Sequence, residues 1–138
     1  LCKQVCTIGT WEDFKKMYAN QINGGTFDVA LMADVLYLLP PRAQVTILKD
    51  IYKLLKKNGV LVLKEVENKP RWFYYWIRAE EYLMQNILKL TFAEQKGLHI
   101  TDKNGYQKLL KKAGFKIKKV APVRGLLPYP HILFVASK

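Results

Sequence analysis

The sequence predicts an α/β protein with a doubly wound, mostly parallel sheet that closes in an antiparallel β-hairpin. Residues 27–66 read in order as a buried strand, a polar loop, an amphipathic helix, a glycine stop and a second buried strand. The same helix-stop-strand junction occurs twice, as LLKKNGV at 54–60 and LLKKAGF at 109–115. Only a short turn, 125–130, separates the last two predicted strands, so these two strands should pair antiparallel.

A short strand and a short helix are predicted before this central unit. Residues 4–8 are apolar enough for a strand, which ends at Gly9-Thr10. A helix then begins at Trp11 and ends at the Asn23-Gly24-Gly25 stop.

The central unit is predicted to be a strand, a helix and a second strand. Val29–Met32 is a near-continuous apolar run, which is typical of a parallel strand buried on both faces. Pro40-Pro41 begins the helix, because proline is tolerated in a first turn. The helix is expected to end at Asn58-Gly59, with the glycine in the left-handed conformation, and Val60–Leu63 forms the next buried strand. The apolar stripe of the helix consists of Val45, Leu48, Ile51, Tyr52 and Leu55.

The second half of the chain is predicted to add two helices and the hairpin. An aromatic-rich stripe predicts a helix over 70–92, as core or as a lid. Thr101-Asp102 is a suitable cap for a following helix that Gly114 stops. The strands 115–123 and 132–136 then form the hairpin.

The formal net charge of +12 would attract polyanions such as nucleic acid, anionic lipid or an acidic partner. The lysines gather at the predicted helix ends, 53–57 and 108–112, where cations offset the helix dipole. We favour a solvated, lysine-rich surface over a nucleic-acid interface, because no RNA-binding signature or recognition helix stands out.

Cysteine content and hydropathy favour a cytoplasmic protein that neither spans a membrane nor binds a metal. Cys2 and Cys6 have no cysteine or histidine companions nearby, so they are interpreted as free thiols. The apolar runs are far shorter than the ~20 residues that a membrane span needs. No signal peptide opens the chain, and a first residue of Leu suggests that the chain begins inside a longer product. Residues 1–138 are expected to form one domain.

Four segments in this order resemble the carboxyl-terminal part of class I S-adenosylmethionine (SAM)-dependent methyltransferases. They are FDVALMADVLYLLPP, LLKKNGVLVLKEV, GLHITDKNGYQKLLKKAGF and the terminal β-hairpin. The resemblance implies a partial Rossmann-like methyltransferase sheet with the family order 3-2-1-4-5-7-6, SAM as the cofactor and a small-molecule or macromolecular methyl acceptor. The strands predicted at 29–32 and 60–63 would be the fourth and fifth of the family, and the strands of the closing hairpin would be the sixth and seventh.

The sequence departs from the family in lacking its glycine-rich G-x-G-x-G loop and the acidic end of its second strand. Either these parts precede Leu1, or the protein is a degenerate relative that serves as a non-catalytic binding or scaffold module. Loss of the first strands also exposes a sheet edge, which a homodimer would cover.

The resemblance implies two groups of cofactor contacts. Thr10 and Trp11 follow the strand whose end flanks the adenine in the family, although a helix cap and a packed indole explain them equally well. The second group is the loop after the fourth strand, where Asp34 would orient the cofactor's ammonium group or the acceptor's proton. The alternative is that Asp34 is a loop carboxylate that only forms hydrogen bonds beside the helix. The residues of that loop are Ala33, Asp34, Val35 and Leu36.

Four residues are catalytic candidates: Asp34, Tyr37, Glu65 and His99. Asp34 and Tyr37 follow a buried strand, and ligands of open α/β sheets bind beyond the carboxyl ends of strands. Tyr37 would shape the methyl-transfer pocket or simply pack, while Glu65 and His99 would act on the acceptor. A structural role is the alternative for His99, because a lone histidine is more often structural than catalytic. His131, next to Pro130 at the start of the last strand, is a weaker candidate still.

Overall fold

The computed structural model describes residues 16, 25–68, 75, 79, 99–123 and 130–138. The strand predicted at 4–8, the helix after Trp11, most of the aromatic helix and the turn at 125–129 lie outside the described residues. The elements, in chain order, are β1 (Phe27–Ala33), η1 (Leu36–Leu38), α2 (Pro41–Leu54), β2 (Leu55–Val66), α4 (Lys103–Lys112), β3 (Lys116–Val123) and β4 (His131–Ser137).

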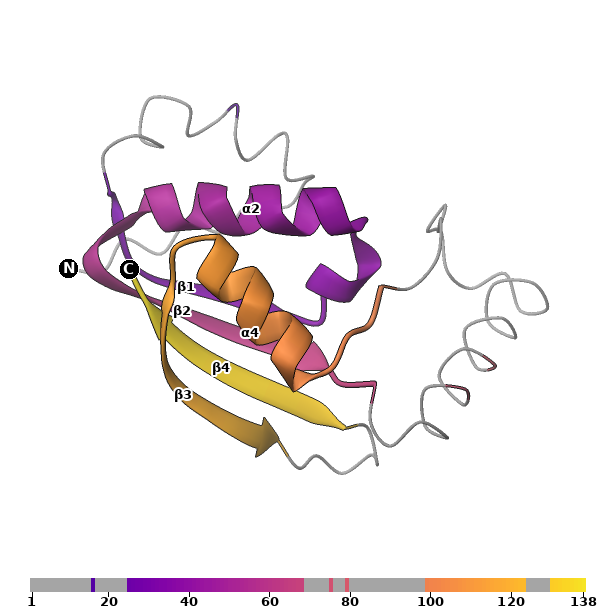
Figure 1. Ribbon diagram of the computed structural model, residues 1–138. Helices are drawn as coiled ribbons and strands as arrows, with labels where there is room; N and C mark the ends of the chain where they lie inside the picture. The colour runs from indigo at the N-terminus through magenta and orange to yellow at the C-terminus, as the bar shows by residue number, and fades with distance from the viewer. Residues whose placement is uncertain (1–15, 17–24, 69–74, 76–78, 80–98, 124–129) are drawn as a thin grey trace.

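The four described strands form one sheet in the order β1-β2-β4-β3 (Figure 1). β1 and β2 are parallel, with Ala30 opposite Leu61. β4 runs antiparallel to both β2 and β3. The predicted α/β class and the closing antiparallel hairpin are confirmed, and the order matches strands 4-5-7-6 of the order that the resemblance implied.

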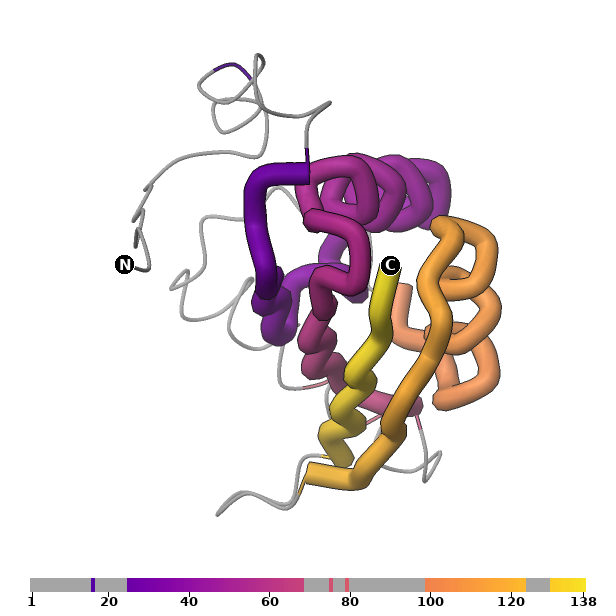
Figure 2. Tube along the Cα trace, turned by 90° about the vertical axis from the view of Figure 1, so that its left-hand side faces the viewer, coloured from indigo at the N-terminus to yellow at the C-terminus, as the bar shows by residue number. Residues whose placement is uncertain are grey.

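The core lies between the sheet and the helices α2 and α4, which cover the same face (Figures 1 and 2). Alternate residues of the central strands face the helices, as the two-residue period of a strand requires. Leu61 and Leu63 of β2 and Phe134 of β4 are fully buried there. The helices contribute Ile47, Leu48 and Ile51 from α2 and Tyr106 and Leu110 from α4.

The prediction that β1 is buried on both faces is wrong. Ala30 and Met32 pack against the core, but Val29 is 59% exposed and Leu31 is 74% exposed. These two side chains point to the face opposite the helices, where no described element covers them. An apolar run therefore marked the strand correctly but did not establish what lies over its second face.

The predicted end of α2 is also wrong. The helix ends at Leu54, and β2 begins at Leu55, where the chain already pairs with Phe27. Asn58, with φ 68°, takes the left-handed conformation that was assigned to Gly59. Glycine is still required at 59, because a Cβ there would lie 2.9 Å from the carbonyl oxygen of Lys56.

The helix α4 begins and ends as predicted. The Asp102 carboxylate caps its first turn by accepting a hydrogen bond of 2.9 Å from the amide of Gly105. Lys111 and Lys112 lie in the last turn, where their charge offsets the dipole. Gly114 follows with φ 103°, a conformation that favours glycine.

We expect Gly105→Ala to destabilise the protein, although alanine is ordinarily the better helix former by about 1 kcal/mol. A Cβ at this position would overlap the Thr101 hydroxyl and lie 2.9 Å from Thr101 Cβ. Overpacking of this kind costs about 1–3 kcal/mol, measurable by urea denaturation. The double variant Thr101→Gly/Gly105→Ala should recover stability relative to Thr101→Gly alone, because the obstructing side chain is gone. An alanine variant as stable as the parent would contradict the predicted clash.

Candidate functional site at the carboxyl edge of the sheet

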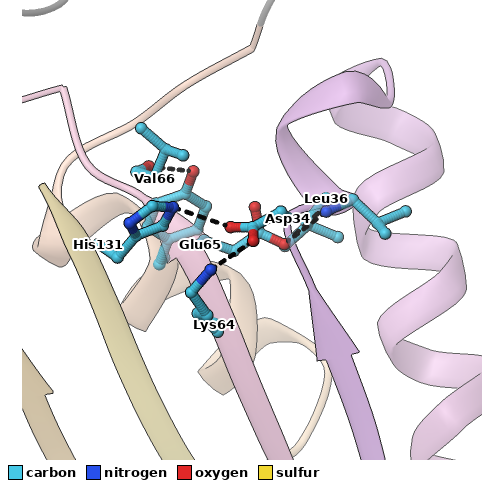
Figure 3. A network of polar contacts seen from close by, with 8 residues as sticks. Asp34, Leu36, Lys64, Glu65, Val66 and His131 are labelled. Atoms are coloured by element: carbon cyan, nitrogen blue, oxygen red, sulfur yellow. Dashed lines mark hydrogen bonds and ion pairs between the residues drawn. The ribbon is translucent and has the colours of Figure 1, made fainter. Parts of the chain in front are cut away.

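Polar side chains gather at the edge where β1 and β2 end and β4 begins (Figure 3). Parallel strands end at the same edge, so the residues that follow β1, which include Asp34, lie close to the end of β2. Val35 and Glu65 are in contact there although 30 residues separate them in the sequence. The amide of Asp34 donates to the carbonyl of Lys64 at 2.9 Å, which joins the two strand ends. His131 reaches this edge because β4 runs antiparallel and pairs it with Val66.

Asp34 occupies the turn that leaves β1 and has a φ of 56°. A non-glycine residue in the left-handed region is uncommon, and a short polar side chain tolerates it best. The carboxylate forms an ion pair with the Lys64 ammonium through Oδ2, and its Oδ1 lies 3.3 Å from Nε2 of His131. The second contact lacks hydrogen-bond geometry, so Oδ1 has no hydrogen-bond partner among the described residues.

Glu65 lies on the opposite face of β2 from Lys64, and its side chain is fully buried. Its Oε1 accepts hydrogen bonds from the amides of Leu36, at 2.8 Å, and Val35, at 3.3 Å. No donor among the described residues reaches Oε2. Burial raises the pKa of Glu65 to about 7, against the lowering effect of the loop amides, and the charge of Asp34 raises it slightly further.

The loop between β1 and α2 is held from other sides as well. Leu36 is fully buried, and Gln44 Nε2 donates to the carbonyls of Leu36 and Leu39, each at 3.0 Å. The amide of His99 donates to the carbonyl of Tyr37 at 2.8 Å. A distant segment of the chain is thereby fixed to the end of β1.

Tyr106 supports the end of β2 from α4. Its hydroxyl donates to the Val66 carbonyl at 2.9 Å, and its ring packs on Phe134 with centroids 6.0 Å apart. Burial raises the pKa of the phenol, and the charge of Glu65 raises it further. Nothing in the sequence spacing of Tyr106 indicated that its hydroxyl would reach a strand carbonyl.

The structure brings most of the predicted site residues to this one edge. Asp34, Tyr37, Glu65 and the backbone of His99 are connected by the contacts above, and Ala33–Leu36 form the loop itself. The chemical roles of these residues stay predictions. Thr10 and Trp11 lie outside the described residues.

Sequence reasoning missed Lys64 and Gln44 as members of the site. Lys64 directly follows the predicted strand Val60–Leu63, and this place at the end of a strand was the available signal. His131, the weaker candidate, contacts Asp34 directly.

Within the described part of the chain, no three His, Cys, Asp or Glu residues are grouped as a metal would require, and none of the helices combines the length and apolarity of a membrane span.

No protein-family model matches the sequence, and no curated protein matches it. Solved structures do match. A SAM-dependent methyltransferase from Methanosarcina mazei superposes with a TM-score of 0.61 at 19% identity, covering 83% of this chain and 60% of its own. Magnesium protoporphyrin IX methyltransferase from Synechocystis PCC 6803, solved with bound S-adenosyl-L-homocysteine (SAH), gives a TM-score of 0.56 at 16% identity. The match covers 83% of this chain and 46% of that protein. A pericyclic reaction enzyme gives a TM-score of 0.60 at 15% identity, and the match covers 82% of this chain and 26% of that protein.

These matches establish the fold, which is that of class I SAM-dependent methyltransferases. The chain spans 60% or less of the length of these three proteins. A pericyclic reaction enzyme with the same fold illustrates that function belongs to the site and not to the fold.

Proposed function

We propose that this chain is the carboxyl-terminal part of a SAM-dependent methyltransferase and carries one side of the cofactor site together with acceptor-facing groups. One observation carries the proposal. The sheet of a methyltransferase fold presents the Asp34 carboxylate on a left-handed turn, at the carboxyl edge where open α/β sheets bind ligands.

The chemistry of the loop suits this cofactor. SAM has a cationic ammonium and sulfonium, and Asp34 offers a carboxylate on a side chain that is about one third exposed, with Oδ1 buried and Oδ2 paired with Lys64. Val35 and Leu38, 42% and 37% exposed, offer apolar surface beside it that would pack on the adenosine. When bound, the cofactor would supply the methyl group on its sulfonium. Thr10 and Trp11 remain the proposed adenine contacts.

The acceptor side is assigned to Tyr37 and His99, whereas Glu65, which the sequence also placed there, is buried and accepts from the amides of the loop before Tyr37. Methyl transfer is an in-line displacement, so the protein mainly positions the acceptor, excludes water and, where needed, takes a proton. Tyr37 and His99 are joined by a backbone hydrogen bond of 2.8 Å, which fits a shared wall of an acceptor site. Either a small molecule or a macromolecule would satisfy this proposal.

Calorimetric titration of SAM and SAH into this chain tests the proposal directly. We expect binding in the micromolar range, because this sequence contains the Asp34 side of the proposed site but not the glycine-rich loop. Competition by an excess of ATP, which shares the adenosine but not the amino-acid group, should be weak. Equal displacement by ATP, or no binding by the folded chain, would contradict the assignment of Asp34 to the cofactor's ammonium.

The second candidate function is a non-catalytic scaffold that forms a homodimer, and exposed apolar surface on β1 favours it. Val29 and Leu31 are the most exposed large apolar side chains of the described strands, and β1 is an edge of the described sheet. Such an edge invites pairing with a second copy. Light scattering alongside the titration should then give twice the chain mass of 16.0 kDa, and a monomer that binds SAH would exclude this alternative.

Two groups of lysines have structural roles that need no nucleic-acid partner. Lys111 and Lys112 offset the dipole of α4. Lys116, Lys118 and Lys119 are exposed on β3, the other edge of the described sheet, where lysine discourages pairing with further strands. Nucleic-acid binding therefore ranks behind methyl transfer, and a cytoplasmic location stays the prediction from Cys2 and Cys6.

A further inference from the structure

The Glu65 carboxyl group occupies an unusual position for an acceptor-side catalyst. Its side chain has no exposed surface, whereas Asp34 beside it is about one third exposed. A group that touches a substrate must be reachable. The burial of Glu65 therefore points to a role exerted through the protein itself.

The partners of Glu65 are the backbone amides of the loop that follows Asp34. Leu36 and Val35 donate to Oε1, and the amide of Tyr37 also stabilises the charged form of the carboxylate. Successive amides that converge after a left-handed residue form an anion-binding turn. Here the anion is the protein's own side chain, supplied by the neighbouring strand.

The side chain of Gln44 and the amide of His99 hold the loop through its carbonyls. Gln44 donates to the carbonyls of Leu36 and Leu39, and His99 donates to that of Tyr37. Among the described residues, Glu65 is the side chain that holds the amides of Val35 and Leu36. Removing its acceptor would leave the buried Leu36 amide without a partner.

We propose that Glu65 is a positioning residue: its buried carboxyl group holds the amides of Val35 and Leu36 and so fixes the conformation in which Asp34 and Tyr37 face the ligand. The ligand part of this inference rests on the proposed function, whereas the loop part does not. Glu65 would control the site without touching the substrate.

The hold on the loop depends on the protonation state of one group. A carboxylate accepts amide hydrogen bonds more strongly than a neutral carboxyl group, so the Leu36 bond should tighten as the pH rises through about 7, the pKa of Glu65. The ionisable groups that face Glu65 are Asp34, from the end of β1, and Tyr106, from α4. Asp34 is in turn paired with Lys64 and His131.

Amide NMR of the chain without added ligand tests the loop part. The Leu36 amide proton should move downfield as the pH rises, with a midpoint near 7, and the movement should vanish in Glu65→Gln, which keeps a carbonyl acceptor but does not titrate. In Glu65→Leu the same amide should lose its protection from hydrogen exchange. Glu67→Gln, at the same strand end, is the matched control and should leave the Leu36 titration unchanged. A Leu36 amide that is insensitive to both Glu65 substitutions would overturn the proposal.

SAH titration of the same variants tests the link to the ligand. Loss of the acceptor in Glu65→Leu should weaken SAH binding about tenfold or more, while Glu65→Gln should restore most of the affinity. Equal affinities for parent and Glu65→Leu, in a chain that binds SAH, would overturn the positioning role. If the parent does not bind SAH, the proposed cofactor fails, and the Leu36 amide alone decides whether Glu65 holds the loop.

Discussion

Replacing Glu65 by glutamine should destabilise the protein in acid and leave it as stable as the parent, or more stable, at alkaline pH. Burial raises the pKa of this carboxyl group from 4.5 to about 7. Between these values the folded chain retains a proton that the unfolded chain has lost, so stability falls as the pH rises. Below the pKa of the unfolded chain, Glu65 is protonated in both the folded and the unfolded state. Above the pKa of the folded chain, ionised Glu65 lowers the free energy of unfolding by the full amount.

The size of the effect follows from the same shift. A difference between 4.5 and about 7 corresponds to roughly 3 kcal/mol. Glutamine is neutral throughout and keeps a carbonyl for the Leu36 amide, but its NH₂ group replaces Oε2, which has no partner among the described residues. That substitution adds a pH-independent cost of about 1–3 kcal/mol. The difference in the free energy of unfolding between variant and parent should therefore change by about 3 kcal/mol from about pH 4 to about pH 8.

Urea denaturation of both proteins across this pH range measures the difference. Groups that titrate equally in parent and variant cancel, which isolates Glu65. Glu67→Gln provides the comparison, since Glu67 is only partly buried and accepts from the amide of Lys103, and its difference from the parent should stay nearly constant. A Glu65→Gln difference that does not vary with pH would show that the carboxyl group is ionised or protonated equally in both states.

The sequence was sufficient for the sheet and insufficient for what lies around it. Apolar runs, a capping aspartate at 102 and the glycine at 114 are local signals, and each predicted its element. The exposure of Leu31 depends instead on what packs over the second face of β1, which a run of apolar letters cannot specify. The early end of α2 depends on the pairing of Leu55 with Phe27, a contact between distant residues.

The site shows the same division between local and distant information. Asp34 and Glu65 were predicted because both stand at strand ends, a position that can be read along the chain. The different environments of Asp34 and Glu65 could not be predicted, because they depend on what packs on each face of the sheet. The two-residue period of β2 sends Lys64 to one face and Glu65 to the other. Register then decides the partners, so Lys64 pairs with Asp34 while Glu65 binds the loop amides.

The Asp34 position combines a charge with a backbone conformation, and three substitutions separate them. Asp34→Asn keeps the short polar shape but removes the charge, Asp34→Gly also relieves the left-handed φ of 56°, and Asp34→Ala removes the charge and adds strain. If the carboxylate binds the cofactor's ammonium, Asp34→Asn and Asp34→Gly should both weaken SAH binding about ten- to hundredfold, the value of a charged hydrogen bond. Asp34→Ala should bind no better and should also be less stable by about 1 kcal/mol.

Calorimetric titration with SAH, paired with urea denaturation, separates these outcomes, and Asp28→Asn is the matched control. Asp28 is an exposed carboxylate at the other end of β1, where it pairs with Lys56. Its replacement should leave SAH affinity unchanged. If Asp34→Asn and Asp34→Gly bind SAH like the parent and only Asp34→Ala fails, the turn matters and the charge does not. The carboxylate would then serve Lys64 and His131, and the cofactor's ammonium would have to be held by another part of the protein.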